Sequence, residues 1–316
     1  MSRAARSGAL DQFRGLAIAW MVPANYMEHI AVVPAWLKHA PDIGFTIIDL
    51  IAPMFMFAIG LSYPASFRRR WEREGRRATL EHFIRRGLAL IGLGSLFSVG
   101  EWLAGFNPSG ILWGVLQAIG AAILLCLPWL WTSRWTRLLS ALVLMFTYQW
   151  FVDTAWLEDV LRSPHAGIQG ALSWTAILLL ATAFADLADS PKFQASLGIA
   201  LLGAGLGLAA VIPVSKHRMS ASFDLIVSGA SALLYLGCAG WVARRRPIAA
   251  LVTWGRNPLV LYVAHLVLLG VFLVPSAPWW HFQAAPPLAI AQGLTLMAVL
   301  HAGARWLERR GVFIAL

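Results

Sequence analysis

A histidine, two carboxylates and an asparagine lie close together near the N-terminus, where they could exchange protons with a substrate. The stretch runs from Asn25 to Asp49 and contains His39 and Asp42. Imidazole titrates near neutral pH, so a histidine with carboxylates nearby is suited to general acid–base work. His39 alone is also typical of an interfacial histidine, and Asp49 alone could cap or brace a helix. Their combination favours a proton-transferring role for His39.

Basic residues at the ends of apolar segments suggest a place for an anion. Asp11 and Arg14 are three residues apart, so they share a helix face. Arg14 either forms an ion pair with Asp11 or contacts an anionic ligand. Arg85 and Arg86 begin an apolar segment. They either extend the basic stretch before it or hold phosphates, for which the guanidinium fork is suited.

Two further polar residues lie in later apolar segments. His265 comes eight residues after Asn257, about 12 Å along a helix. It is either a buried neutral histidine bonded to a neighbour or a functional group, the default interpretation of an ionisable residue inside a membrane. Asp224 opens another segment and is predicted to lie near the positive end of the helix dipole.

Apolar helices must position all these residues. The chain has 316 residues, of which 59% are apolar and 13% charged, about half the charged share of a soluble protein. Runs of roughly 20 apolar residues, enough to cross a ~30 Å hydrocarbon core, are expected at 12–34, 45–66, 83–104, 111–131, 136–152, 168–187, 193–212, 222–242, 250–274 and 286–306. The predicted fold is an all-α, polytopic transmembrane bundle of about ten spanning helices, forming one domain over residues 1–316.

The distribution of positive charge predicts the orientation. Of the 25 lysines and arginines, 21 fall in segments that share one side if the N-terminus is inside. By the positive-inside rule, both termini are then cytoplasmic and the protein is a multi-pass protein of the inner (plasma) membrane. The net charge of +10 thus comes from short loops, so we expect no nucleic-acid partner.

Other sequence features predict little chemistry. Cys126 and Cys238 lie inside apolar segments without Cys or His at ligand spacing, so we expect no disulfide and no metal site. The first apolar run carries Asp11, Arg14 and Asn25, so we expect it to remain as a helix and not to be a cleaved signal.

An ordered set of short motifs resembles the catalytic region of heparan-α-glucosaminide N-acetyltransferases and their bacterial relatives. The motifs are Leu10-Asp11-x-Phe13-Arg14-Gly15, Asn25-Tyr26, His39-Ala40-x-x-x-Gly44-x-Thr46-x-x-Asp49-Leu50-x-x-Pro53, Arg86, Gly114-Val115-Leu116-Gln117, Pro213-Val214-x-Lys216-x-x-x-Ser220-x-Ser222-Phe223 and Asn257-x-x-x-x-Tyr262-x-x-His265. They cover nearly the whole chain, as in a minimal bacterial member.

The resemblance implies transfer of acetyl from cytoplasmic acetyl-CoA to an amino sugar on the far side of the membrane. The family's catalytic histidine falls on His39 and its partner asparagine on Asn25. In the mechanism that we expect, Asp49 or Asp42 would orient the histidine. Residues expected to bind the donor are Arg14, Arg86, Asn257 and His265, and those expected to bind the acceptor are Asp42, Lys216 and Ser222. The expected partners are coenzyme A, a sugar or glycan, the lipid bilayer and, in a homodimer, a second copy of the chain.

The sequence departs from the family pattern mainly around the acceptor. Asp42, Ser215 and Met219 replace a Trp, an Asn and a Trp, and Ala118 replaces a common Arg. The first helix also resembles that of O-acyltransferases acting on surface polysaccharides, in which His29 would serve as the histidine. A small-solute transporter and a non-catalytic membrane scaffold are the other classes that the polar residues allow.

Overall fold

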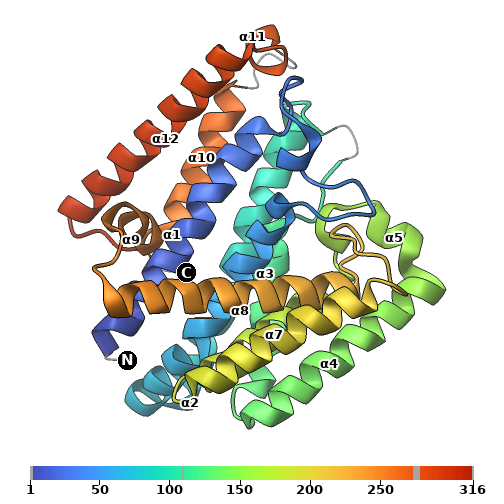
Figure 1. Cartoon of the computed structure of the whole chain (residues 1–316), viewed down its shortest axis with the longest axis vertical. Coiled ribbons are helices and arrows are strands. Elements are labelled where there is room, and N and C mark those ends of the chain that lie inside the picture. The colour runs from blue at the N-terminus through green and yellow to red at the C-terminus, as the bar shows by residue number, and fades with distance from the viewer. Residues whose placement is uncertain (1–2, 108–109, 273–277, 315–316) are drawn as a thin grey trace. The chain divides into compact units, whose positions relative to one another are not determined.

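The computed structural model describes residues 3–107, 110–272 and 278–314, and these residues form helices joined by short turns (Figure 1). The α-helices are α1 (Arg3–Met27), α2 (Ile51–Leu103), α3 (Val115–Cys126), α4 (Arg134–Phe151), α5 (Leu157–Leu161), α6 (Ala171–Ala185), α7 (Pro191–Leu208), α8 (Ala221–Arg244), α9 (Ala249–Arg256), α10 (Pro258–Phe272), α11 (Trp279–Phe282) and α12 (Pro286–Arg309). No strand occurs among the described residues, which confirms the all-α class.

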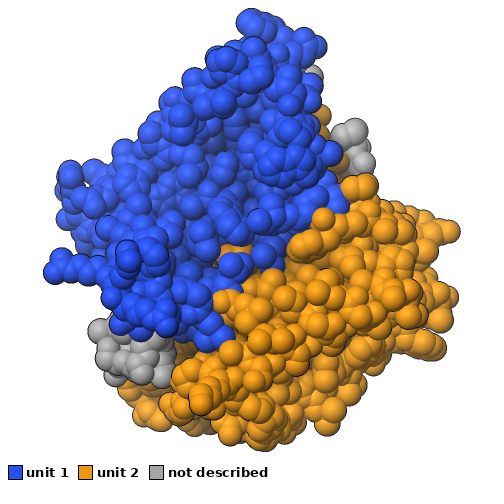
Figure 2. All heavy atoms as spheres, in the orientation of Figure 1, with its two compact units in different colours: residues 1–40, 46–51, 234–316 blue, residues 41–45, 52–233 orange. Residues whose placement is uncertain are grey.

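The chain divides into two compact units, coloured separately in Figure 2. Unit 1 comprises residues 1–40, 46–51 and 234–316, and unit 2 comprises residues 41–45 and 52–233. Unit 1 therefore contains α1, α9, α10, α11, α12 and the end of α8. Unit 2 contains nearly all of α2, the helices α3 to α7 and the start of α8.

Several helices are long and apolar enough to cross a membrane. By length and composition these are the helical stretches Ile47–Leu103, Arg134–Leu161, Ala221–Arg244 and Pro286–Arg309, with shorter apolar helices at Val115–Trp129, Ala171–Ala185 and Pro258–Gly270. α4 presents large apolar side chains to the outside, as a lipid-facing helix does: Trp135, Leu139, Val143, Phe146 and Trp150.

Each of the ten predicted segments overlaps a helix, but several boundaries were wrong. The first helix ends at Met27 and not at 34, and the segments 45–66 and 83–104 fall in the single helix α2. The basic stretch 67–82, expected to be a loop, is helical apart from Gly75, whose φ of 79° lies in the left-handed region. Arginine favours helix, so the two arms of α2 extend through the charged stretch and break only at a glycine. The predicted helix 250–274 is interrupted at Asn257, because Pro258 disfavours helical geometry in the residue before it.

Sequence signals at the helix starts account for several elements. Ser133 caps α4 by accepting a hydrogen bond from the backbone N–H of Thr136 at 3.1 Å. Gln117, a polar residue in an apolar helix, accepts from the backbone N–H of Gly114 at 3.1 Å and so closes the start of α3. Proline at the first positions of α7 and α12 suits a place where no helical N–H bond is needed.

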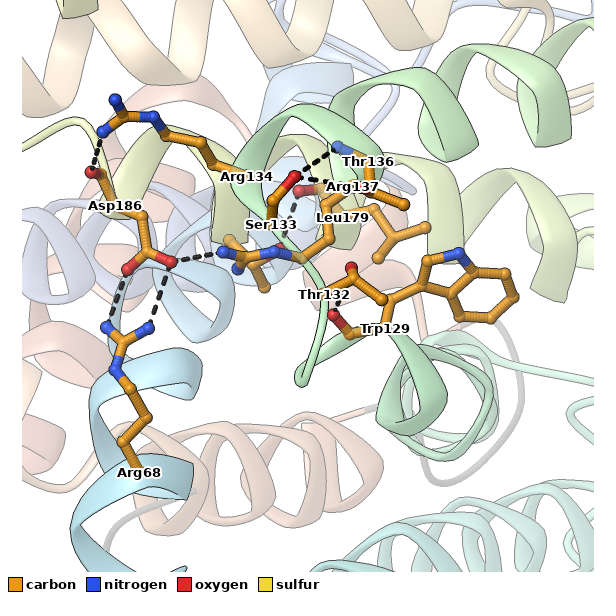
Figure 3. Close-up of polar contacts among 10 residues, drawn as sticks. Arg68, Trp129, Thr132, Ser133, Arg134, Thr136, Arg137, Leu179 and Asp186 are labelled. Atoms are coloured by element: carbon orange, nitrogen blue, oxygen red, sulfur yellow. Dashed lines mark hydrogen bonds and ion pairs between the residues drawn. The ribbon is translucent and has the colours of Figure 1, made fainter.

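The polar groups of unit 2 gather at the two opposite ends of α4. At its start, Arg137 binds Asp186, the residue that follows α6, and Arg68 and Arg134 bind the same residue at 2.7 and 3.1 Å (Figure 3). Near its end, the Tyr148 hydroxyl donates to the carbonyl of Arg218 at 2.9 Å. An 18-residue helix is about 27 Å long, close to the thickness of a hydrocarbon core.

Asp186 is the carboxylate that neutralises the arginines at this end. Burial raises the pKa of Asp186, but the hydrogen bonds from Arg68 and Arg137 outweigh that effect, and the net pKa lies below its ordinary value. Because Arg137 is only 2% exposed, its charge depends on this single carboxylate. The contact joins α2, α4 and the end of α6 within unit 2.

In unit 1, α1 and α9 approach so closely that only glycine fits at two positions. A Cβ at Gly15 would overlap the carbonyl of Leu251, and a Cβ at Gly255 would overlap the carbonyl of Asp11. Small residues of this kind let membrane helices pack backbone against backbone.

We therefore expect Gly15→Ala and Gly255→Ala each to destabilise the protein by about 1–3 kcal/mol, because an added methyl group cannot be accommodated without moving backbone. Thermal unfolding in detergent, followed by tryptophan fluorescence, measures this. Gly270→Ala is the matched control, since nothing lies within 4 Å of its Cβ. It should leave stability unchanged or raise it by up to about 1 kcal/mol. Equal melting temperatures for all three variants would contradict the close packing.

Candidate functional site

The imidazole of His39 is held by the carboxylate of Asp49. His39 Nδ1 lies 2.8 Å from Asp49 Oδ1, with the aspartate side chain 0% exposed and the histidine side chain 29% exposed. A carboxylate only accepts, so in the neutral ring the shared proton is assigned to Nδ1. Nε2 then carries the lone pair, which is the arrangement that a general base needs.

The backbone around Asp49 fixes the position of its carboxylate. Oδ2 accepts from the backbone N–H of Thr46 at 2.9 Å and of Ala40 at 3.2 Å, and from the hydroxyl of Thr46 at 3.2 Å. Asp49 thus closes the short helix Ile47–Leu50 in the way that a capping residue does. Asp49 therefore both caps this helix and contacts the ring of His39, so capping does not exclude a role in orienting the histidine.

The loop that carries His39 folds back onto the end of α1. The backbone N–H of His39 donates to the Glu28 carboxylate at 3.2 Å, and the Lys38 ammonium donates to the carbonyl of Ile30 at 2.7 Å. Glu28 was not among the predicted site residues. Its one sequence signal is its place three residues after Asn25, on the same helical face.

Asn25 contacts a histidine that is 240 positions away in the sequence. Its Nδ2 lies 2.9 Å from Nε2 of His265. Both residues belong to unit 1. An amide nitrogen only donates, so Nε2 of His265 accepts this bond. The sequence assigned His265 to the donor site, whereas the structure makes it the partner of Asn25. Asn25 lies in the last turn of α1. His39 is held near the same end of this helix, because its backbone N–H donates to Glu28.

The other two predicted residues of unit 1 have partners of their own. Arg14 lies 3.9 Å from Asp11, the helical pair that the spacing predicted. Asn257 is fully buried and bridges the backbone of the C-terminal segment, donating to Val312 at 3.0 Å and accepting from Ile314 at 2.8 Å. Asn257 thus holds the C-terminal segment at the break between α9 and α10.

In unit 2, two of the three predicted acceptor residues, Asp42 and Ser222, lie in one hydrogen-bonded cluster. Asp42 accepts from the Ser215 hydroxyl at 3.0 Å and from Nε of Arg218 at 2.8 Å. The backbone N–H of Ser215 donates to the Ser220 hydroxyl at 3.0 Å, and that hydroxyl lies 3.1 Å from the hydroxyl of Ser222. Asp42 and Ser222 are therefore linked through Ser215 and Ser220.

The loop 213–220 holds the remaining acceptor residue and an unusual backbone conformation. Lys216 is buried in this loop, and its carbonyl accepts from the backbone N–H of Met219 at 3.2 Å. Met219 is buried with a φ of 49°, a region that residues other than glycine seldom adopt. Such strain persists only where the surroundings enforce it.

Arg86 lies half-buried on the second arm of α2, in unit 2. Its neighbour Arg85 is exposed and pairs with Glu81 at 2.5 Å. Arg218, which the sequence did not single out, is the partner of Asp42. Its only sequence signal was its place within a predicted motif.

Comparison with known proteins gives the family. The sequence model described as heparan-alpha-glucosaminide N-acetyltransferase, catalytic, matches residues 6–237. The chain belongs to this family. Its family and its long apolar helices make it a membrane protein of the transmembrane acetyltransferase class. The family match includes His39, Asn25 and Asp49 but ends before Asn257 and His265. No curated protein matches the chain.

The Asp42–Arg218 pair predicts a pH-dependent contribution to stability. Hydrogen bonds from Arg218 hold the pKa of Asp42 below its ordinary value, against the opposing effect of partial burial. A carboxyl with a depressed pKa stabilises the fold above its unfolded-state pKa and loses that contribution as the pH falls through its folded-state pKa.

Asp42→Asn should therefore lower stability at neutral pH, by at most about 1 kcal/mol for such a partly exposed pair. The difference from wild type should vanish in acid. Melting curves of both proteins across this pH range test the prediction. Asp159→Asn removes a more exposed partner of Arg162 and serves as control. An Asp42→Asn deficit that persists unchanged in acid would show that the charge of Asp42 is not its cause.

Proposed function

We propose that this protein transfers an acetyl group from cytoplasmic acetyl-CoA to an amino sugar on the extracytoplasmic side of the inner membrane. The observation that carries the proposal is the imidazole of His39, oriented by a fully buried carboxylate inside the family-matched region. The geometry supports a base whose Nε2 faces away from its carboxylate partner. His29, the candidate for an O-acyltransferase site, instead stacks on Phe282 at 5.6 Å.

His39 would act as the general base. The acceptor nitrogen attacks the thioester carbonyl carbon while Nε2 of His39 takes the proton that the amine loses. The carbon–sulfur bond then breaks, and the imidazolium returns its proton to the leaving thiolate. Asp49 stabilises the imidazolium during this step and keeps the ring in one orientation.

Asn25 would stabilise the oxyanion that forms when the thioester carbonyl is attacked. An amide has two N–H groups, and the bond to His265 engages one of them. His265 thereby orients the amide, so that the second N–H can be aimed at developing negative charge. This assigns His265 to positioning Asn25 as well as to the donor side.

The donor and acceptor would enter from opposite sides. Arg14 and Arg86 are our candidates for the phosphates of coenzyme A, since arginine binds phosphate with two parallel hydrogen bonds. Asp42, Lys216 and Ser222 are our candidates for the sugar. This arrangement requires ten spans with both termini cytoplasmic, and a homodimer within the bilayer is compatible with it.

Acetyl transfer tests the proposed function directly. With labelled acetyl-CoA inside vesicles and a panel of amino sugars outside, wild type should transfer label, and His39→Ala should lower the rate about 10²–10⁴-fold, the share of a general base. Asp49→Asn should lower the rate with little change in KM, because it removes the group that orients the base. His82→Ala is the matched control and should keep full activity.

Equal transfer by wild type and His39→Ala would remove His39 from the mechanism. Single-turnover kinetics separate direct transfer from an acetyl-histidine intermediate, because the latter alone gives a burst and ping-pong behaviour. Labelled product from a neutral sugar but not from an amino sugar would reassign the reaction to O-acetylation.

The orientation is tested by labelling cysteines placed at exposed positions. Trp36 precedes His39 by three residues and is 66% exposed, and Arg76 lies in the basic stretch of α2. A membrane-impermeant maleimide should modify Trp36→Cys from outside whole cells and Arg76→Cys only after the membrane is opened. The parent chain is the control, because Cys126 and Cys238 are buried. Labelling of both sites from the same side would falsify the orientation.

A further inference from the structure

A buried carboxyl at the start of α8 contacts a serine that also contacts a strained loop. Asp224 Oδ2 and the carbonyl of Met219 are both hydrogen-bonded to the hydroxyl of Ser173 on α6, the latter at 3.3 Å. All three residues belong to unit 2, and all are fully buried.

The number of protons available for these two hydrogen bonds indicates whether the carboxyl of Asp224 is protonated. A serine hydroxyl has one proton, and here it faces two oxygens. If Asp224 carries a proton, it donates to Ser173 and Ser173 donates to Met219, so every contact has one hydrogen. If Asp224 is ionised, one of the two contacts has none. We propose that Asp224 is a neutral hydrogen-bond donor that positions the Met219 loop through Ser173.

The surroundings of Asp224 favour the neutral form. Its second oxygen, Oδ1, is buried without a hydrogen-bond partner among the described residues, which suits a carbonyl oxygen better than half of a negative charge. The titratable group that faces it is Tyr148 on α4, whose hydroxyl donates to Arg218 instead. Asp224 does lie in the first turn of α8, as the sequence predicted, but the dipole there compensates only a small part of the cost of burying a charge.

The contact would act on the acceptor side of the reaction. Met219 is the residue with positive φ in the loop 213–220, and that loop carries Lys216 and leads to Ser222. Fixing the Met219 carbonyl holds this conformation, which a freed loop would leave. Asp224 and Ser173 are thus positioning residues, and this role in acceptor binding rests on the proposed function.

Two substitutions at Asp224 separate a neutral donor from a charged group. Asparagine keeps a donor of the same shape, so Asp224→Asn should retain the acceptor KM within about twofold, whereas Asp224→Ala and Ser173→Ala should raise it about tenfold with little change in kcat. The double variant should be no worse than either single one. Ser228→Ala is the matched control, a buried serine one turn further along α8 whose hydroxyl has no partner among the described residues.

An infrared difference spectrum between wild type and Asp224→Asn detects the proton on the Asp224 carboxyl without an activity assay. A protonated-carboxyl band present in wild type and missing from the variant is the expected result, and its absence overturns the proposal. An Asp224→Asn variant as impaired as Asp224→Ala overturns it too, as does an Asp224→Ala variant that behaves like wild type. If Asp224→Ala does not fold, the asparagine variant and the infrared band decide. If wild type transfers no acetyl, the proposed function fails while the infrared result still stands.

Discussion

The cost of leaving a polar group unsatisfied away from water governs how this chain is built. Apolar helices supply few partners, so most of the buried polar side chains described above pair with one another or with backbone. In unit 1, the Asp49 carboxylate accepts bonds from one imidazole, one hydroxyl and two backbone N–H groups. In unit 2, Asp186 accepts hydrogen bonds from arginines on α2 and α4, and Asp42 accepts hydrogen bonds from Arg218 in the loop after α7.

This constraint also explains how the His39 side chain is held in place within a loop. An exposed loop would let the imidazole rotate, but His39 is tied through its ring to Asp49 and through its backbone to Glu28. Asp49 is in turn tied to residues on both sides of it in the chain. If His39 acts as the proposed base, a ring held in this way would lose little orientational freedom during the reaction, which is the usual advantage of a positioned catalytic group.

Three of the four departures from the family pattern lie near one another, and the fourth, Ala118, lies on α3. Asp42 and Ser215 contact each other, and Met219 lies in the same loop as Ser215. Asp42, Ser215 and Met219 therefore belong to one neighbourhood, while His39, Asn25 and Asp49 keep the types of the motifs that the chain resembles. Under the proposed function, these departures would change how the acceptor is bound and leave the residues proposed for proton transfer unchanged.

The sequence was sufficient for the helices and for the contacts between near neighbours. A hydrocarbon core demands apolar runs of a set length, so the apolar helices could be located approximately from the hydropathy of the sequence. His39 and Asp49 are ten residues apart, and Asp11 and Arg14 three, so their proximity follows from short chain geometry. The stretch 67–82 shows the limit of this approach: its charge is typical of a loop between membrane helices, but arginine is a good helix former, so the helix continues through the charged stretch.

Contacts between distant residues could be decided only by tertiary structure. Asn25 meets His265 across 240 positions, Asp42 meets Arg218 across 176, and Asp224 meets Ser173 across 51. The sequence marked most of these residues as polar groups in apolar surroundings, which need partners, but it did not say which partner each one takes. That choice depends on which helices pack together, and packing depends on side-chain shapes summed over many residues and not on the spacing within any one segment.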